Sequence, residues 1–313
     1  MKSLRYYLLP LFGALLCIPF GGCKMGNASG TWPKVINYAY SPTTEQLQGA
    51  MRAQETKAMR LYLQNQLHLP VNLVQVSQYS ATIEAMRADK VDIAHFGGLS
   101  YLIAAQKADA QAIVAHGFPD GKLGGYHSVI AVPKDSPYHS MADLKAHAKD
   151  IVFALADPAS TSGDLYPRVE LQSIGIDPDR DFKQILYANG HLADLMAIES
   201  GKVDAGAFDQ MYMTRLIAQG RMKPGDVRIL WRSELIPGEP VAVRGGLPEK
   251  LKKEIQEAFV AIPTKDPALW ADMNKIVYNS TEGTVYLPVT DATYDSLRRF
   301  AMQVKQFNFV EPK

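Results

Sequence analysis

Short β-branched runs alternate with helix-forming runs along most of this chain, and this alternation is the feature that most limits its fold. In the first third of the sequence, we expect strands over residues 35–39, 71–76, 91–96 and 112–117, and helices over 45–67, 80–88 and 99–107. Strands that alternate with helices predict a mostly parallel sheet, covered by helices on both faces. In such sheets, ligands gather at the carboxyl ends of the strands.

The alternation is interrupted by an extended run near residues 126–132 and then begins again. We expect further strands over 151–155, 182–186, 203–208 and 227–231, and helices over 166–173, 192–199, 212–218, 248–261 and 292–307. A second extended run lies near 241–244. We therefore expect an α/β protein of two lobes joined by two hinge strands. Lobe 1 would comprise residues 34–125 and 241–313, and lobe 2, with the hinge strands, residues 126–240.

The N-terminal residues predict an export signal followed by a lipid anchor. Two basic residues precede an apolar run over residues 8–20, which is too short to span a bilayer as a helix. The run ends in two glycines and Cys23, a pattern that resembles a bacterial lipobox. We expect a lipoprotein-type signal peptide over 1–22, lipidation of Cys23 and a flexible tether over 23–33. The alternative is an ordinary cleaved signal.

Charge and cysteine content exclude several classes of function. The chain has 33 Lys+Arg against 32 Asp+Glu and no basic run, so it lacks the positive surface that nucleic-acid binders need. Its only cysteines, Cys17 and Cys23, lie within or next to the expected signal. The remainder therefore has no thiol for a disulfide or for covalent catalysis. The seven histidines show no metal-binding spacing, so we expect no metal and no cofactor.

Three consecutive hydroxyl residues, Ser160, Thr161 and Ser162, stand between an expected strand and an expected helix. At a helix N-terminus, such a run presents hydroxyls and free backbone N–H groups to one point, which suits a tetrahedral oxyanion. A helix cap is the alternative, because Ser and Thr are favoured there without any ligand. Gly97 and His191 stand at two further junctions where a strand ends and a helix begins.

Several runs resemble the phosphate-, phosphite- and phosphonate-binding proteins of ABC importers. The runs that carry the resemblance most clearly are residues 79–87 (YSATIEAMR), 91–100 (VDIAHFGGLS) and 157–163 (DPASTSG). Shorter matches follow in the expected order, so the resemblance covers most of the chain after the expected signal. It implies a type II periplasmic-binding-protein fold with the ligand in the cleft between two lobes.

The resemblance also implies nine ligand-binding residues, which fall into three groups. The donors to the phosphorus oxyanion would be Ser160, Thr161, Ser162 and His191; the residues lining the other lobe would be Tyr79, Phe96 and Gly97; and the acids would be Asp209 and Glu239. The chain departs from the family pattern at residues 208–211, where the last position lacks an acid that helps to hold a ligand amine. Asp209 would replace that acid in part, or Asp209 or Glu239 would accept a hydrogen bond from a protonated oxyanion.

The function implied is the extracytoplasmic substrate-binding component of an ABC transporter. Such a protein is a monomer in the periplasm or at the cell surface, which closes around phosphonate, phosphite or phosphate and delivers it to a permease in the inner membrane. One alternative is a sensory lipoprotein that presents its ligand to a membrane kinase. Another is a hydrolase that uses Ser160, His191 and Asp209, although no G-x-S-x-G elbow surrounds Ser160. We expect binding without catalysis.

Overall fold

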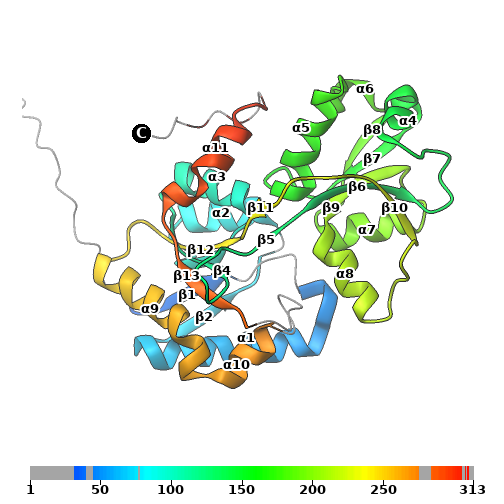
Figure 1. Cartoon of the computed structure of the whole chain (residues 1–313). Coiled ribbons are helices and arrows are strands. Elements are labelled where there is room, and N and C mark those ends of the chain that lie inside the picture. The colour runs from blue at the N-terminus through cyan, green and yellow to red at the C-terminus, as the bar shows by residue number, and fades with distance from the viewer. Residues whose placement is uncertain are drawn as a thin grey trace, which may run out of the picture.

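Two mixed sheets, each flanked by helices, form the two lobes of the molecule (Figure 1). The computed structural model describes residues 32–39, 45–76, 78–274 and 283–304, together with Phe307 and Phe309. The expected signal peptide, Cys23 and nearly all of the expected tether lie outside these residues. Within them, none of the helices combines the length and the apolar character that a bilayer crossing requires. The predicted α/β class is confirmed. The expectation of a mostly parallel sheet is wrong, because each sheet combines parallel with antiparallel pairs.

The sheet of lobe 1 has six strands in the order β13-β4-β12-β3-β1-β2. In chain order they are β1 (Ile36–Ala39), β2 (Val71–Val74), β3 (Ile93–His95), β4 (Gln111–Gly117), β12 (Pro240–Val243) and β13 (Val285–Pro288). Strand β1 pairs in parallel with β2 and β3. Strand β12 runs antiparallel to both of its neighbours, β3 and β4, so the sheet is mixed.

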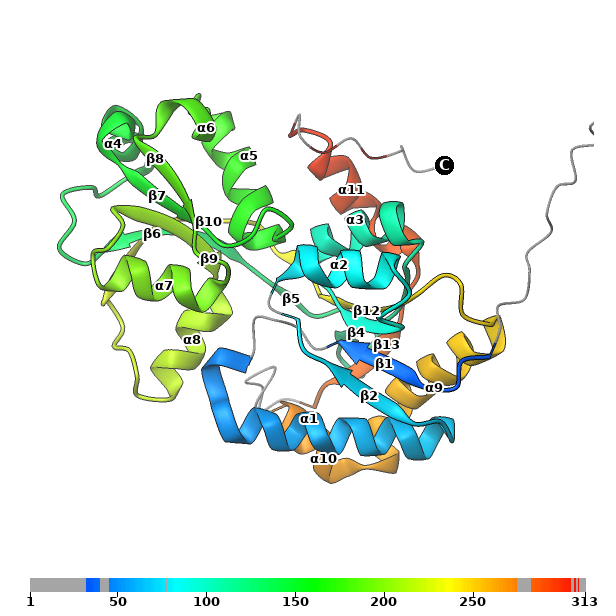
Figure 2. The same ribbon diagram turned by 180° about the vertical axis from the view of Figure 1, so that it is seen from behind.

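Helices cover both faces of this sheet because successive side chains along a strand point to opposite sides. In β12, Val241 and Val243 pack on one face with α1 (Glu45–Leu67), α9 (Glu249–Lys265) and α10 (Pro267–Met273). Ala242, between them, packs on the other face with α2 (Tyr79–Arg87), α3 (Gly98–Ala108) and α11 (Asp295–Ala301). Figure 2 shows α2 and α3 on one side of the sheet and α1 and α10 on the other.

Lobe 2 contains a five-stranded sheet in the order β10-β6-β9-β7-β8. Its strands are β6 (Ser128–Pro133), β7 (Val152–Leu155), β8 (Gln184–Tyr187), β9 (Ala205–Asp209) and β10 (Val227–Arg232). Its helices are α4 (Met141–Ala146), α5 (Tyr166–Ser173), α6 (Pro178–Asp181), α7 (His191–Glu199) and α8 (Gln210–Ala218). Leu144 of α4 and Leu171 of α5 pack on one face, and Leu195 of α7 and Leu216 of α8 on the other.

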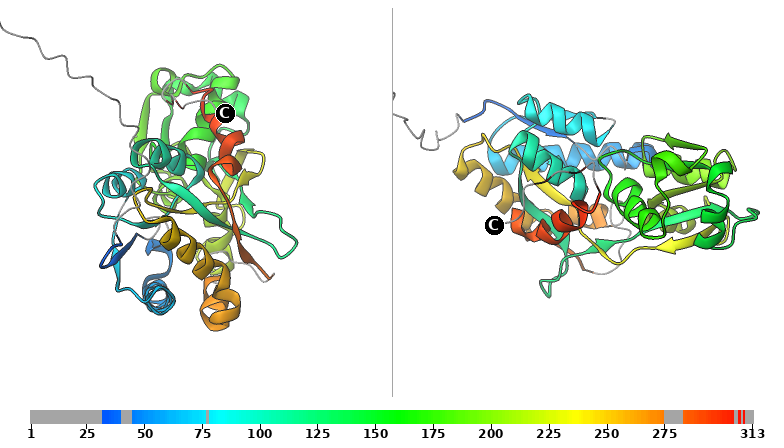
Figure 3. Two further views of the ribbon diagram at one scale, coloured as in Figure 1. Left: turned by 90° about the vertical axis from the view of Figure 1, so that its left-hand side faces the viewer. Right: turned by 90° about the horizontal axis from the view of Figure 1, so that it is seen from above.

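A two-stranded antiparallel sheet, formed by β5 (Gly125–Tyr126) and β11 (Ile236–Pro237), joins the lobes. Viewed from above, the lobes lie side by side (Figure 3). The expected second hinge strand at residues 241–244 is wrong, because residues 241–243 belong to β12 inside the sheet of lobe 1. Of the first expected hinge strand, only Tyr126 lies in the two-stranded sheet, since β6 starts at Ser128. A buried apolar strand and an extended crossing have the same local pattern, and long-range pairing alone separates them.

The C-terminal helix is shorter than the expected run over 292–307. A 3-10 helix, Asp291–Tyr294, starts at a capping box of Thr290 and Thr293 and leads into α11, which ends at Ala301. The sequence pattern also gave no prediction for β13, α4, α6 and α10. Each of these four elements has seven residues or fewer, so none carries enough periods of its pattern to stand out.

Candidate functional site

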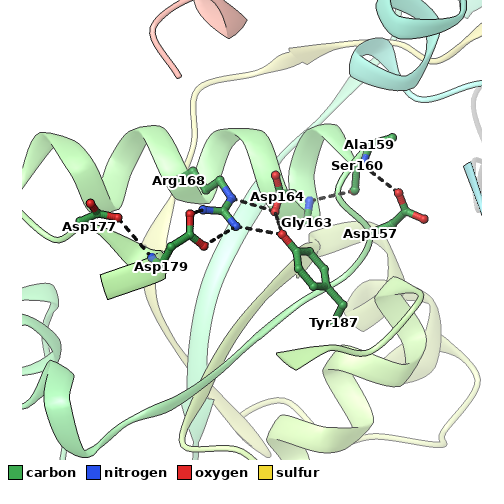
Figure 4. A network of polar contacts seen from close by, with 9 residues as sticks. All are labelled: Asp157, Ala159, Ser160, Gly163, Asp164, Arg168, Asp177, Asp179 and Tyr187. Carbon is green, nitrogen blue, oxygen red and sulfur yellow. Dashed lines mark hydrogen bonds and ion pairs between the residues drawn. The ribbon is translucent and has the colours of Figure 1, made fainter. Parts of the chain in front are cut away.

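The hydroxyl run lies where lobe 2 passes from β7 into α5. A π-helix over Thr161–Leu165 begins directly after Ser160 and continues into α5. The Ser160 Oγ accepts a hydrogen bond from the backbone N–H of Gly163 at 3.0 Å, so this residue is the helix cap (Figure 4). π-helical turns are rare and occur frequently at functional sites. The cap accounts for one hydroxyl and leaves those of Thr161 and Ser162, both buried, for other roles.

His191 opens α7 beside this run, and its hydrogen bonds define its tautomer. The Nδ1 atom accepts the backbone N–H of Asp209 at 3.1 Å, so the ring proton lies on Nε2. Nε2 is 3.4 Å from the Ser160 Oγ. Burial lowers the pKa of His191 to about 3, so the ring is neutral at physiological pH. His191 therefore presents one N–H donor toward the hydroxyl run.

This arrangement differs from that of a hydrolytic triad. In a triad, the base accepts the serine proton at one ring nitrogen, while a carboxylate accepts from the other. Here, His191 Nδ1 contacts the backbone N–H of Asp209 and not its carboxylate. The carboxylate instead caps α8, where Oδ1 accepts from Met211 N at 2.8 Å. The geometry therefore gives no support to hydrolysis by Ser160, His191 and Asp209.

Three expected residues of lobe 1 lie close to the hydroxyl run. Tyr79 is the first residue of α2, Phe96 follows β3, and Gly97 directly precedes α3. A Cβ atom on Gly97 would lie 3.2 Å from the Thr161 Oγ1 and 3.8 Å from the Tyr79 ring. Glycine at this position thus allows close approach of lobe 2, and the side chains of Tyr79 and Phe96 are buried in the same core cluster.

The two expected acids form a second part of the site. Burial raises the pKa of Asp209 to about 6, against the opposing effects of the Met211 N–H and the Arg215 guanidinium. Burial and the Asp209 carboxylate raise the pKa of Glu239 to about 8, again opposed by Arg215. Glu239 is half-buried in the segment between β11 and β12. Both carboxyl groups therefore bind protons more tightly than ordinary acids do.

Tyr126 connects the two parts of the site and was missed by sequence reasoning. Its side chain lies in hinge strand β5, hydrogen-bonds the Thr161 hydroxyl and interacts with the carboxyls of Asp209 and Glu239. Its place at the start of the expected hinge strand over residues 126–132 was a signal that could have identified it. Arg215, on α8, was missed as well, because nothing local marks an arginine six residues after Asp209 as its neighbour.

Ser128 donates its hydroxyl to the carbonyl oxygen of Ser162 at 2.6 Å, which ties the hydroxyl run to β6. Among the residues that the structure describes, no group of three or more His, Cys, Asp or Glu side chains is placed to hold a metal ion. What the site offers is a set of neutral donors beside two carboxyl groups.

Comparisons with known proteins identify relatives along most of the chain. A family model for the periplasmic substrate-binding protein of phosphonate ABC transporters matches residues 42–294. The chain is 34% identical over 202 residues to the phosphonates-binding periplasmic protein of Escherichia coli, across 63% of this chain and 58% of that protein. It is 33% identical over 253 residues to the phosphate-import protein PhnD of Mycolicibacterium smegmatis, across 75% and 76% of the two chains.

Among solved structures, the chain is similar to a binding-protein component of an ABC phosphonate transporter from Pseudomonas aeruginosa. The TM-score is 0.74 at 26% sequence identity, and the superposition covers 86% of each chain. The prediction of a two-lobed periplasmic-binding-protein fold is therefore confirmed.

Proposed function

The chain belongs to the family of periplasmic substrate-binding proteins of phosphonate ABC transporters, and on that basis we propose that it binds a phosphorus oxyanion between its lobes and delivers it to a membrane permease. The observation that carries the proposal is the buried run of Ser160, Thr161 and Ser162 at the start of a π-helix, with the Nε2–H of His191 directed at it. The protein binds its ligand and does not transform it.

Neutral donors suit an oxyanion in this position. Hydroxyls, the His191 N–H and the free N–H groups at a helix start can together satisfy several oxygens, and the helix end adds a partial positive charge. A buried donor left unpaired costs about 1–3 kcal/mol. A ligand that lacks one oxygen is therefore bound much less tightly, which gives the site its selectivity.

Asp209 and Glu239 face the remainder of the ligand. A carboxyl group with a raised pKa can donate a proton to an oxyanion, and its ionised form can accept one from a P–OH group or from an ammonium group. The relatives named above bind phosphonates or import phosphate, according to their descriptions, and both ligands present a phosphorus oxyanion. Tyr79 and Phe96 would close the site from lobe 1.

Attachment to the membrane is part of the proposal. Cys23 would carry the lipid, and residues 23–33 would leave the two lobes free to reach the permease as a monomer. A lipid anchor keeps the binding protein near its transporter, so the captured ligand is released where it is taken up.

Titration calorimetry tests the proposed function. We would titrate the purified protein with phosphite, phosphate, methylphosphonate, aminoethylphosphonate and sulfate. Binding of at least one phosphorus oxyanion, weakened by about tenfold or more in Ser162→Ala, is the expected result, because one charge-assisted hydrogen bond contributes about 1.5–3 kcal/mol. Absence of heat with all four phosphorus compounds would reject the proposal.

A further inference from the structure

Two helices of lobe 1 begin at the boundary with lobe 2 without a side-chain cap of their own. Gln78 precedes α2 and makes no capping hydrogen bond, and Gly97 precedes α3 and has no side chain to make one. The first N–H groups of any helix have no partner inside that helix. Capping of α2 and α3 must therefore come from elsewhere.

Lobe 2 provides the missing partners. The Asp157 carboxylate accepts a hydrogen bond from the backbone N–H of Tyr79, the first residue of α2. The Thr161 Oγ1 accepts from the backbone N–H of Leu99, the second residue of α3, at 2.8 Å. Both acceptors are buried, with 4% and 2% of their surface exposed. Helices α2 and α3 are thus both capped across the lobe boundary.

Both capping side chains are also held by hydrogen bonds within lobe 2 or to the hinge. The Asp157 Oδ1 also accepts the N–H of Ala159 at 2.7 Å, which fixes the carboxylate within its turn (Figure 4). The Thr161 hydroxyl also hydrogen-bonds Tyr126 in the hinge. The Thr161 hydroxyl is therefore engaged by lobe 1 and the hinge, in contrast to the purely ligand-binding role that the family resemblance implies.

Apolar contacts surround these two hydrogen bonds. Leu165 and Tyr166 of lobe 2 share one buried cluster with Ile83 and Leu99 of lobe 1. The Tyr166 ring stacks on Phe300 of α11 with centroids 4.2 Å apart. These contacts cross the same lobe boundary as the capping bonds.

We propose that Asp157 and Thr161 are closure residues: they cap α2 and α3 across the cleft, and these caps exist only while the lobes are together. The Asp157 charge also complements the positive end of the α2 dipole. Both residues then act on ligand binding by positioning lobe 1 against lobe 2. The inference goes beyond the proposed function, since it does not depend on which oxyanion is bound.

Small-angle scattering tests the closure directly. Protein expressed from the full chain would be compared with the double variant Asp157→Ala/Thr161→Val and with the conservative pair Asp157→Asn/Thr161→Ser, with and without methylphosphonate. We expect the Asp157→Ala/Thr161→Val variant to have a larger radius of gyration than the wild type. The Asp157→Asn/Thr161→Ser variant should have the wild-type radius, because Asn and Ser retain the capping oxygens. Circular dichroism would verify that each variant is folded.

Binding kinetics provide a readout that a merely structural role would not change. Stopped-flow fluorescence with methylphosphonate should show dissociation faster by about fivefold in Asp157→Ala, the change that corresponds to one lost cap. The association rate should stay within about twofold, because the capping bonds form after the ligand has entered. Asp157→Asn should restore most of the wild-type dissociation rate, because Asn keeps a capping oxygen but not the charge that complements the α2 dipole.

The outcomes separate this inference from the proposed function. A double variant as compact as wild type would overturn the closure role. So would a wild type that scatters as an open molecule in the presence of a phosphorus oxyanion that calorimetry shows it to bind. An Asp157→Ala variant with unchanged dissociation, or with slowed association alone, would overturn it as well. A wild type that binds no phosphorus oxyanion would defeat the proposed function, while scattering would still decide whether the caps hold the lobes together.

Discussion

Single residues set the protonation state of the site. His191 is kept neutral by burial, with its proton on Nε2, and Asp209 and Glu239 are kept partly protonated near neutral pH. Ser160 and His191 could be predicted as hydrogen-bond donors from local features of the sequence. Ser160 belongs to a run of hydroxyl residues, and His191 stands at the start of an expected helix. The raised pKa of Glu239 could not be predicted, because it depends on burial and on the carboxylate of Asp209, which is distant in the sequence.

Stability should respond to pH through Glu239. The pKa of this group is raised from its ordinary value of 4.5 to about 8, so between these values the folded protein holds a proton that the unfolded chain has released. The contribution that Glu239 makes to the free energy of unfolding is fully present below pH 4.5 and is lost as the pH rises toward 8. Glu239→Gln removes the titration. Urea unfolding from about pH 4.5 to about pH 8.5 should therefore show the variant gaining stability relative to wild type as the pH rises.

The control for this prediction is Glu234→Gln, a change at an exposed acid in the segment just before β11. This control removes one carboxyl charge at the surface, so it measures how much of any change follows from the lost charge alone. Parallel profiles of wild type and Glu239→Gln would show that Glu239 titrates alike in the folded and unfolded states, which would contradict its raised pKa in the folded protein.

At the scale of elements, the π-helix is held by an ionic network built around the buried pair of Arg168 and Asp164 (Figure 4). Arg168 on α5 donates from Nε to Asp164 of the π-helix at 2.9 Å and from Nη1 to Asp179 of α6 at 2.9 Å, and it contacts the hydroxyl of Tyr187. Arg168 and Asp164 are 3% and 0% exposed. The network therefore fixes the element that begins with the hydroxyl run.

Arg168→Met should destabilise the protein by about 3–5 kcal/mol at about pH 8, because it leaves a buried carboxylate without its partner. Arg180→Met is the matched control. Arg180 is exposed and pairs with Asp181 at 2.9 Å, so its loss should lower the stability far less than the loss of Arg168 does, because solvent screens an exposed ion pair. Chemical denaturation of both variants measures the difference. Equal losses would show that the network does not stabilise lobe 2.

Sequence patterns predicted most elements but few of the contacts between them. The starts of α3 and α7 were marked by glycines and by polar residues, which act locally. The hydrogen bond from Tyr79 to Asp157 could not be predicted from the sequence, because Tyr79 lies in the other lobe and contributes only its backbone N–H. Strand β12 was predicted to be a hinge strand, because the apolar residues Val241, Ala242 and Val243 show the same pattern in a buried strand of a sheet as in an extended crossing between lobes.

At the scale of the whole molecule, two lobes with separate sheets meet along a buried boundary and are joined by β5 and β11. The alternation of strands and helices predicted the two lobes, since each repeat of the pattern builds one sheet. Their closure depends on contacts between residues far apart in the sequence, such as Leu99 and Thr161. Such contacts become visible only in three dimensions.

The proposed anchor gives a prediction for the whole molecule in its cell. Cys23→Ala should move the protein from the membrane fraction to the soluble periplasmic fraction, because a lipid chain is then absent. Immunoblots of the two fractions measure this. A variant that stays with the membrane as the wild type does would argue against lipidation at Cys23.

In the proposed function, a phosphorus oxyanion lies between the lobes against the hydroxyl run. A crystal structure of the protein grown with the phosphorus compound that binds most tightly would show whether this claim holds. We predict that the phosphorus group lies within hydrogen-bonding distance of Ser160, Ser162 and His191. A ligand bound elsewhere on the molecule, or held without contact to the hydroxyl run, would contradict the claim.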